Sequence, residues 1–129
     1  MGGECQPVPE GPAEAEQRVV LVVEDEVVLR MAVSAHLRDC GFVVIEAVDA
    51  EEAVELLHAN HRIWLVFSDI TMPGTMDGDQ LAEWISERYP EIRILLTSGI
   101  TQRGRQPFLA KPYSFLELQR RIEEMLGIP

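Results

Sequence analysis

The chain has 129 residues, enough for one domain with a single hydrophobic core and too few for two. Its 22 acidic against 11 basic residues give a formal charge of −11, which argues against broad binding to nucleic acid or to an anionic membrane. The apolar runs are strand-length, far short of the roughly 20 residues that a membrane-spanning helix needs. The N-terminus also lacks a signal-peptide pattern, so we expect a cytoplasmic protein.

Residues 1–17 are rich in proline, glycine and glutamate and nearly devoid of large apolar side chains. A segment of this composition cannot bury enough apolar surface to offset the loss of chain entropy. We therefore predict a disordered N-terminal arm over residues 1–17, followed by one domain over residues 18–129.

Beyond the arm, short apolar runs alternate with segments of helical period. The apolar runs predict strands at residues 19–23, 42–47, 64–68, 92–97 and 108–110. The periodic segments predict helices at residues 27–40, 50–60, 78–89 and 114–126. Strands and helices that alternate in this way indicate an α/β fold with a parallel sheet covered by helices on both faces.

Local signals agree with these boundaries. Asp49 and Ser114 are good N-cap residues, and Gly41 stands where a left-handed residue ends a helix. Pro90 stops the third predicted helix. The interval 99–107 breaks the rhythm, because it combines glycines, a proline and arginines with little apolar content. We predict a loop there, without a packed helix.

Polar side chains stand at the ends of four predicted strands. Glu24 and Asp25 follow the first, Asp69 follows the third, Ser98 the fourth and Lys111 the fifth. The carboxyl ends of parallel strands converge at one edge of the sheet, so these side chains should share one crevice.

A divalent cation fits such a crevice. Magnesium prefers oxygen ligands, keeps several waters and is commonly held by one or two carboxylates. Asp25 and Asp69 can bind it directly, the longer Glu24 can hold a metal-bound water, and the backbone carbonyl of Thr71 can add another oxygen. The cation would also offset the mutual repulsion of the acidic groups.

The same crevice has the groups needed to handle a phosphoryl group. Beside a cation, the carboxylate of Asp69 can act as a nucleophile toward phosphorus, as in other aspartyl-phosphate chemistry. The phosphoryl oxygens then need positive or donating partners. Lys111 offers an ammonium group and Ser98 a hydroxyl.

Five motifs, taken in order, resemble a response-regulator receiver domain of two-component signalling, the CheY-like family. They are Val22-Val23-Glu24-Asp25-Glu26, Ser68-Asp69-Ile70-Thr71-Met72-Pro73, Met76-Asp77-Gly78, Thr97-Ser98-Gly99 and Phe108-Leu109-Ala110-Lys111-Pro112-Tyr113. The resemblance covers the chain from about Arg18 to its end. It implies a flavodoxin-like, doubly wound fold with a five-stranded parallel sheet in the order 2-1-3-4-5.

The resemblance also implies a function. Asp69 would be the phosphoacceptor, receiving phosphate from a sensor histidine kinase or a histidine phosphotransfer protein, with Mg²⁺ as the required cofactor. Glu24 and Asp25 would be the acidic pair and Lys111 the phosphate-contacting lysine. By the same resemblance, Ser98 and Phe108 would be the switch residues. Such a domain is a phosphoacceptor that assists its own phosphorylation and dephosphorylation, and is not otherwise an enzyme.

Two features depart from the family pattern. The turn at residues 73–78 is one residue longer than the common form. Only twelve residues separate Ser98 from Lys111, too few for the usual fourth helix and a full fifth strand, so that helix should be missing or irregular.

Three functional interpretations follow. We expect a single-domain response regulator, a monomer or weak dimer that signals to an unknown downstream protein, because no effector domain follows Pro129. One alternative is a pseudo-receiver that binds proteins without being phosphorylated. A nucleotide- or flavin-binding protein is a weak third, because no glycine-rich phosphate loop follows the first strand and its acidic residues would repel phosphate.

Overall fold

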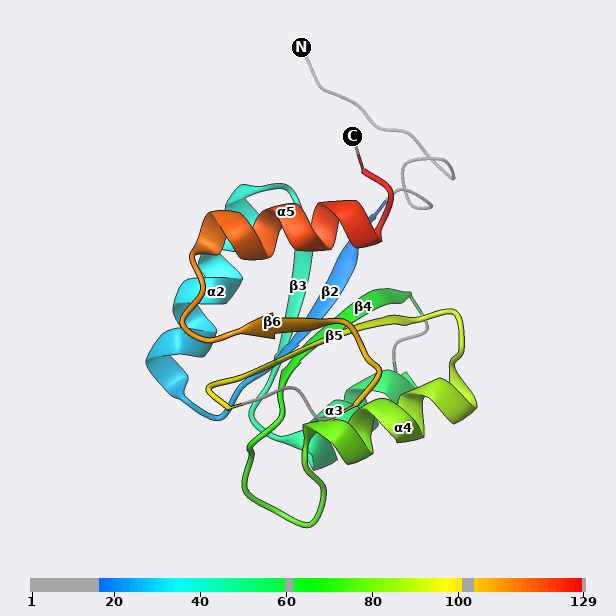
Figure 1. Cartoon of the computed structure of the whole chain (residues 1–129). Coiled ribbons are helices and arrows are strands. Elements are labelled where there is room, and N and C mark those ends of the chain that lie inside the picture. The colour runs from blue at the N-terminus through cyan, green and yellow to red at the C-terminus, as the bar shows by residue number, and fades with distance from the viewer. Residues whose placement is uncertain (1–16, 60–61, 101–103, 129) are drawn as a thin grey trace.

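Five parallel strands form one sheet in the computed structural model of the chain, which describes residues 17–59, 62–100 and 104–128 (Figure 1). The strands are β2 (Val19–Val23), β3 (Val43–Ala47), β4 (Ile63–Asp69), β5 (Arg93–Ser98) and β6 (Phe108–Ala110). Their order across the sheet is β3-β2-β4-β5-β6. Counted along the chain this is 2-1-3-4-5, so the predicted flavodoxin-like topology is confirmed.

Four helices cover the two faces of this sheet in the described part of the chain. Figure 1 shows α2 (Val27–Asp39) and α5 (Phe115–Met125) on one face. The other face carries α3 (Ala50–Ala59) and α4 (Gly78–Arg88). No helix within the described ranges is long and apolar enough to cross a membrane.

The sheet divides the hydrophobic core into two layers, because successive strand side chains point to opposite faces. In β2, Leu21 and Val23 pack toward α3 and α4, whereas Val20 and Val22 pack toward α2 and α5. All five residues of β2 are buried, as expected for a central strand that is covered on both faces. The carboxyl end of β2 is therefore held rigidly, and the acidic pair follows it directly.

The predicted caps are present. Ser114 begins α5 with a reciprocal capping box: its hydroxyl accepts from the Glu117 backbone N–H at 3.0 Å, and the Glu117 side chain accepts from the Ser114 N–H. The Asp49 carboxylate accepts from the backbone N–H of Glu52 at 2.9 Å, at the start of α3. Gly41 has a φ of 97°, the left-handed conformation that glycine adopts without a steric penalty.

The interval between β5 and β6 has no helix in its described residues, 99–100 and 104–107. The amide of Gln106 donates to the hydroxyl of Ser86 on α4 at 3.4 Å, so the last part of the interval runs beside that helix. The prediction of a loop is confirmed for these residues. Residues 101–103 and the predicted arm, except for Gln17, lie outside the described part, and the arm stays a prediction.

Candidate functional site

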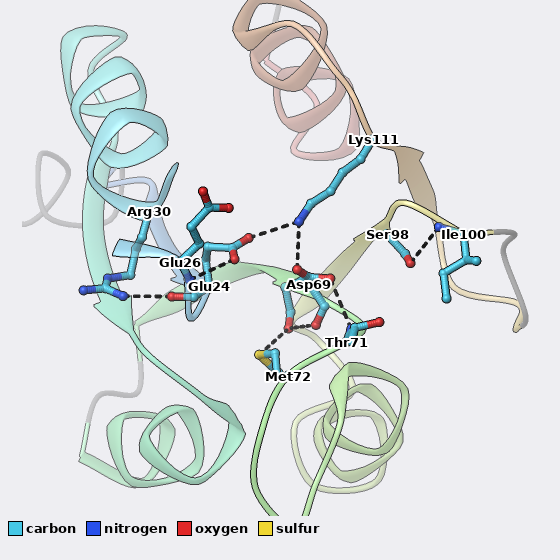
Figure 2. A network of polar contacts seen from close by, with 10 residues as sticks. Glu24, Glu26, Arg30, Asp69, Thr71, Met72, Ser98, Ile100 and Lys111 are labelled. Carbon is cyan, nitrogen blue, oxygen red and sulfur yellow. Dashed lines mark hydrogen bonds and ion pairs between the residues drawn. The ribbon is translucent and has the colours of Figure 1, made fainter. Parts of the chain in front are cut away.

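The side chains that follow the strands do converge. Glu24 and Asp25 follow β2, while Asp69 ends β4 and Ser98 ends β5. Lys111 follows β6, and its backbone N–H donates to the Ser98 carbonyl at 3.0 Å, a bond that belongs to the pairing of Ser98 with Ala110. Figure 2 shows the Lys111 side chain extending past β5 toward Asp69 at the end of β4 and Glu24 just after β2.

An ion pair lies at the centre of the site. The Lys111 Nζ is 2.8 Å from Asp69 Oδ2 and 3.5 Å from Glu24 Oε1 (Figure 2). Both acidic residues are largely removed from water, with Asp69 7% and Glu24 5% exposed. Charge-assisted contacts are stronger where water is excluded, so this ammonium holds both carboxylates in place.

Burial and charge act in opposite directions on the pKa values of this pair of groups. Burial raises the pKa of Glu24, against the opposing effects of the Glu26 backbone N–H and of Lys111. Burial alone would lower the pKa of Lys111, but the hydrogen bond to Asp69 and the charges of Asp69 and Glu24 outweigh it, so that pKa is raised. The Lys111 amine therefore stays protonated at neutral pH.

We expect the protein to lose stability above about pH 10. Burial, followed by the charges of Glu24 and Asp69, raises the pKa of Tyr113, and that of Lys111 is raised as well. The folded state then keeps protons that the unfolded chain releases, so the free energy of unfolding falls as the pH rises. Urea unfolding between pH 8 and 11 measures this, and Tyr113→Phe should flatten the profile. A free energy of unfolding of the wild type that stays constant or rises over this pH range would contradict the raised pKa values of Tyr113 and Lys111.

Three carboxylates at this site have the chemistry of a cation-binding group. Oxygens of Glu24, Asp25 and Asp69 lie within 4.8 Å of one another, and Asp25 is exposed to solvent. Carboxylate oxygens are the ligands that Mg²⁺ prefers, and a metal-bound water can bridge to a carboxylate that does not reach the ion directly. The donor set fits a hard divalent cation.

The turn beyond Asp69 is fixed at several points. The Thr71 N–H donates to Asp69 Oδ1 at 3.1 Å, which orients the carboxylate from the side opposite Lys111 (Figure 2). Further along, the Glu51 carboxylate accepts from both the backbone N–H and the hydroxyl of Thr75. These bonds lower the pKa of Glu51, the hydroxyl having the larger effect. The longer turn is thus anchored to the first turn of α3.

The two predicted switch residues, Ser98 at the end of β5 and Phe108 at the start of β6, lie on the same face of the sheet, because Phe108 is in register with Leu96, two residues before Ser98. The Ser98 hydroxyl accepts from the backbone N–H of Ile100 at 3.1 Å (Figure 2). Phe108 is half-buried and packs against the core layer between the sheet and helices α3 and α4. In this conformation Ser98 therefore stabilises the start of the loop that follows β5.

Arg30 supports the site, and sequence reasoning missed it. Its guanidinium donates to the backbone carbonyl of Glu24 at 2.9 Å and to Glu46 Oε1 at 3.2 Å (Figure 2). The Glu26 N–H in turn donates to Glu24 Oε2 at 3.1 Å. The acidic pair is fixed from the α2 side by these bonds. The only sequence signal for this support is that an arginine, Arg30, follows the acidic pair by about one helical turn and that a glutamate, Glu46, lies on the next strand.

Comparison with known proteins agrees with this geometry. The family model of the response regulator receiver domain matches residues 20–123, which is most of the chain. This chain belongs to the receiver domain family. Receiver domains are phosphoacceptor domains of two-component signalling.

The receiver domain is similar to parts of larger proteins. It is 32% identical over 117 residues to the sensor kinase CckA of Brucella abortus, which covers 83% of this chain and 12% of the kinase. The crystal structure of the receiver domain from the hybrid histidine kinase CckA is 33% identical and aligns with a TM-score of 0.75, over 84% of this chain and 98% of that domain.

Another similar structure is a complex that contains beryllofluoride and magnesium. A CheX–CheY–BeF₃–Mg²⁺ complex from Borrelia burgdorferi includes a chain 28% identical to this one, with a TM-score of 0.77 over 84% of this chain and 89% of that chain. The metal and the fluoride belong to that complex.

Proposed function

We propose that this receiver domain accepts a phosphoryl group on Asp69 from the phosphohistidine of a sensor histidine kinase or histidine phosphotransfer protein, in the cytoplasm. The observation that carries the proposal is the Asp69 carboxylate itself. It is nearly buried, oriented by Thr71, and held between Lys111 and two further carboxylates. A nucleophilic carboxylate requires such fixed orientation and a neighbouring positive charge.

Each neighbour has a distinct part in the transfer. Glu24, Asp25, Asp69 and the Thr71 carbonyl would hold Mg²⁺, which neutralises charge on the phosphoryl oxygens when bound. Lys111 offers its ammonium to the phosphoryl group, since it already contacts Asp69 at 2.8 Å. Ser98 exchanges its bond with Ile100 for one with a phosphoryl oxygen, and this exchange transmits the change to the loop after β5.

The surface beside the site suits docking of the phosphodonor protein. A hollow of about 510 Å³ opens next to Lys111 and is lined by Glu26, Leu29, Gly99, Lys111, Pro112 and Tyr113. The start of α2 adds three exposed apolar side chains, Val27, Val28 and Met31. Apolar residues that remain this exposed around a polar centre indicate a contact surface for a protein partner.

Phosphorylation with a small donor tests the proposal. The protein is incubated with acetyl phosphate and Mg²⁺, and its mass is followed. We expect a mass increase of one phosphoryl group that is stable in acid, labile in base, prevented by EDTA and mapped to Asp69. If neither acetyl phosphate nor a panel of phosphohistidine donors adds mass, the domain is a pseudo-receiver that acts by binding alone.

We expect Lys111→Ala to permit phosphorylation but to weaken the switch. The carboxylate nucleophile and the acidic residues remain, whereas the charge-assisted contact to the phosphoryl group is lost. A charged hydrogen bond contributes about 1.5–3 kcal/mol, so beryllofluoride affinity should fall roughly ten- to a hundredfold. Fluorescence or calorimetric titration with beryllofluoride and Mg²⁺ measures this.

Arg120→Ala is the matched control, because it removes one exposed cation from α5 without touching the acidic cluster. It should bind beryllofluoride like the wild type. Wild-type affinity in Lys111→Ala as well would remove Lys111 from the proposed role.

A further inference from the structure

Thr97 has a buried hydroxyl without a partner. The residue is 1% exposed, and among the described residues its Oγ1 has no hydrogen-bond partner. Buried side-chain hydroxyls nearly always have one, and each exception needs an explanation. A valine of the same shape would fill this position without the cost of an unsatisfied polar group.

The sheet places Thr97 at the centre of the site. Thr97 is in register with Asp69 on one side and with Leu109 on the other. Paired residues of parallel strands point to the same face, so all three side chains face helices α2 and α5. Leu95 and Leu109 do belong to the core layer on that face.

The Lys111 side chain must cross β5 to reach Asp69, because β5 lies between their two strands. On the face that Asp69 and Leu109 share, the residue of β5 level with both is Thr97. The unsatisfied hydroxyl thus lies under the Lys111–Asp69 ion pair. The two oxygens of the Asp69 carboxylate meanwhile accept from Thr71 and Lys111.

We propose that Thr97 is a positioning residue of the phosphorylated state and contributes a second hydroxyl in addition to that of Ser98. In the unphosphorylated protein the Lys111 ammonium donates a hydrogen bond to Asp69 Oδ2. A phosphoryl group draws the ammonium outward to its own oxygens, and the Thr97 hydroxyl then donates to the Asp69 side chain. The bond satisfies a buried group only after phosphorylation, and so favours that state.

This inference rests on the proposed phosphoacceptor function, and beryllofluoride with Mg²⁺ is the probe. Thr97→Val keeps the shape and removes the hydroxyl, whereas Thr97→Ser keeps the hydroxyl. The matched control is Ser34→Ala on α2, since Ser34 is 0% exposed and its hydroxyl also has no partner among the described residues. Melting temperature without the probe and dissociation constant for the probe are measured for every variant.

Thr97→Val should melt at a higher temperature than the wild type and bind beryllofluoride about three- to tenfold more weakly, the range expected for one neutral hydrogen bond. Ser34→Ala should also melt higher but bind with wild-type affinity, and Thr97→Ser should stay within about twofold of the wild type, since its hydroxyl is retained. If Thr97→Val binds beryllofluoride with wild-type affinity, or melts at a lower temperature than the wild type without the probe, this inference is overturned. The proposed phosphoacceptor function would still stand. A wild-type protein that does not bind the probe would remove the phosphoacceptor function itself.

Discussion

Asp69→Asn is expected to abolish phosphorylation altogether. The amide keeps the size of the carboxylate, and its single oxygen can still accept the hydrogen bond from Thr71, whereas the bond from Lys111 to the second oxygen is lost because an NH₂ group only donates. It cannot attack phosphorus as a carboxylate does, and it removes one of the three charges of the acidic cluster. Mass spectrometry after incubation with acetyl phosphate and Mg²⁺ should show no added phosphoryl group.

Asp25→Asn distinguishes the loss of a proposed metal ligand from the loss of the nucleophile. Asp25 is exposed and belongs to the acidic cluster, whereas Asp69 is largely buried and lies 2.8 Å from the Lys111 Nζ. The Asp25→Asn protein should be phosphorylated slowly at millimolar Mg²⁺ and faster as the metal concentration is raised. Stoichiometric incorporation in Asp69→Asn would show that another residue accepts the phosphate.

Gly78→Ala is expected to lower the free energy of unfolding by about 2–4 kcal/mol. A Cβ at Gly78 would lie 2.3 Å from the Asp69 carbonyl oxygen and 2.6 Å from the Ile70 Cα. Both neighbours are backbone atoms, so neither can turn aside as a side chain can. The start of α4 would have to move away from the end of β4, and Asp69 with it. Urea unfolding measures the loss, and phosphorylation should slow in parallel.

Gly99→Ala is the appropriate control for a glycine next to the site. A Cβ at Gly99 would have no atom of the described structure within 4 Å. The free energy of unfolding of the Gly99→Ala protein should differ from that of the wild type by less than about 1 kcal/mol. Equal losses in Gly78→Ala and Gly99→Ala would mean that the contact with the β4 backbone is not what makes Gly78 necessary.

The fold was predictable because local signals and the global pattern agree. The buried run Val19–Val23 became β2 with the predicted ends, and the caps at Asp49 and Ser114 mark helix starts within one residue of those expected. The absence of a helix at the described residues 99–100 and 104–107 was also predictable, since the interval after β5 has too little apolar content to pack as a helix. Strand length and capping depend on nearby residues, and the sequence displays those directly.

The contents of the site were predictable, but not all of its contacts. Strand ends in a parallel sheet converge, so the meeting of Asp69 with Lys111 followed from topology. The bond from Ile100 to the Ser98 hydroxyl depends on a side-chain rotamer that no pattern reveals. The support from Arg30 and the unsatisfied Thr97 hydroxyl depend on register between strands and on packing between distant segments.

Lys111 is the only lysine in the chain. Its ε-amine is half-buried and ion-paired, and its raised pKa leaves little neutral amine to react with acylating reagents at physiological pH. Acetylation at this position would replace the ammonium beside Asp69 with an uncharged amide. Any enzyme or reagent that acylates the ε-amino group of a lysine in this chain must therefore act beside Asp69.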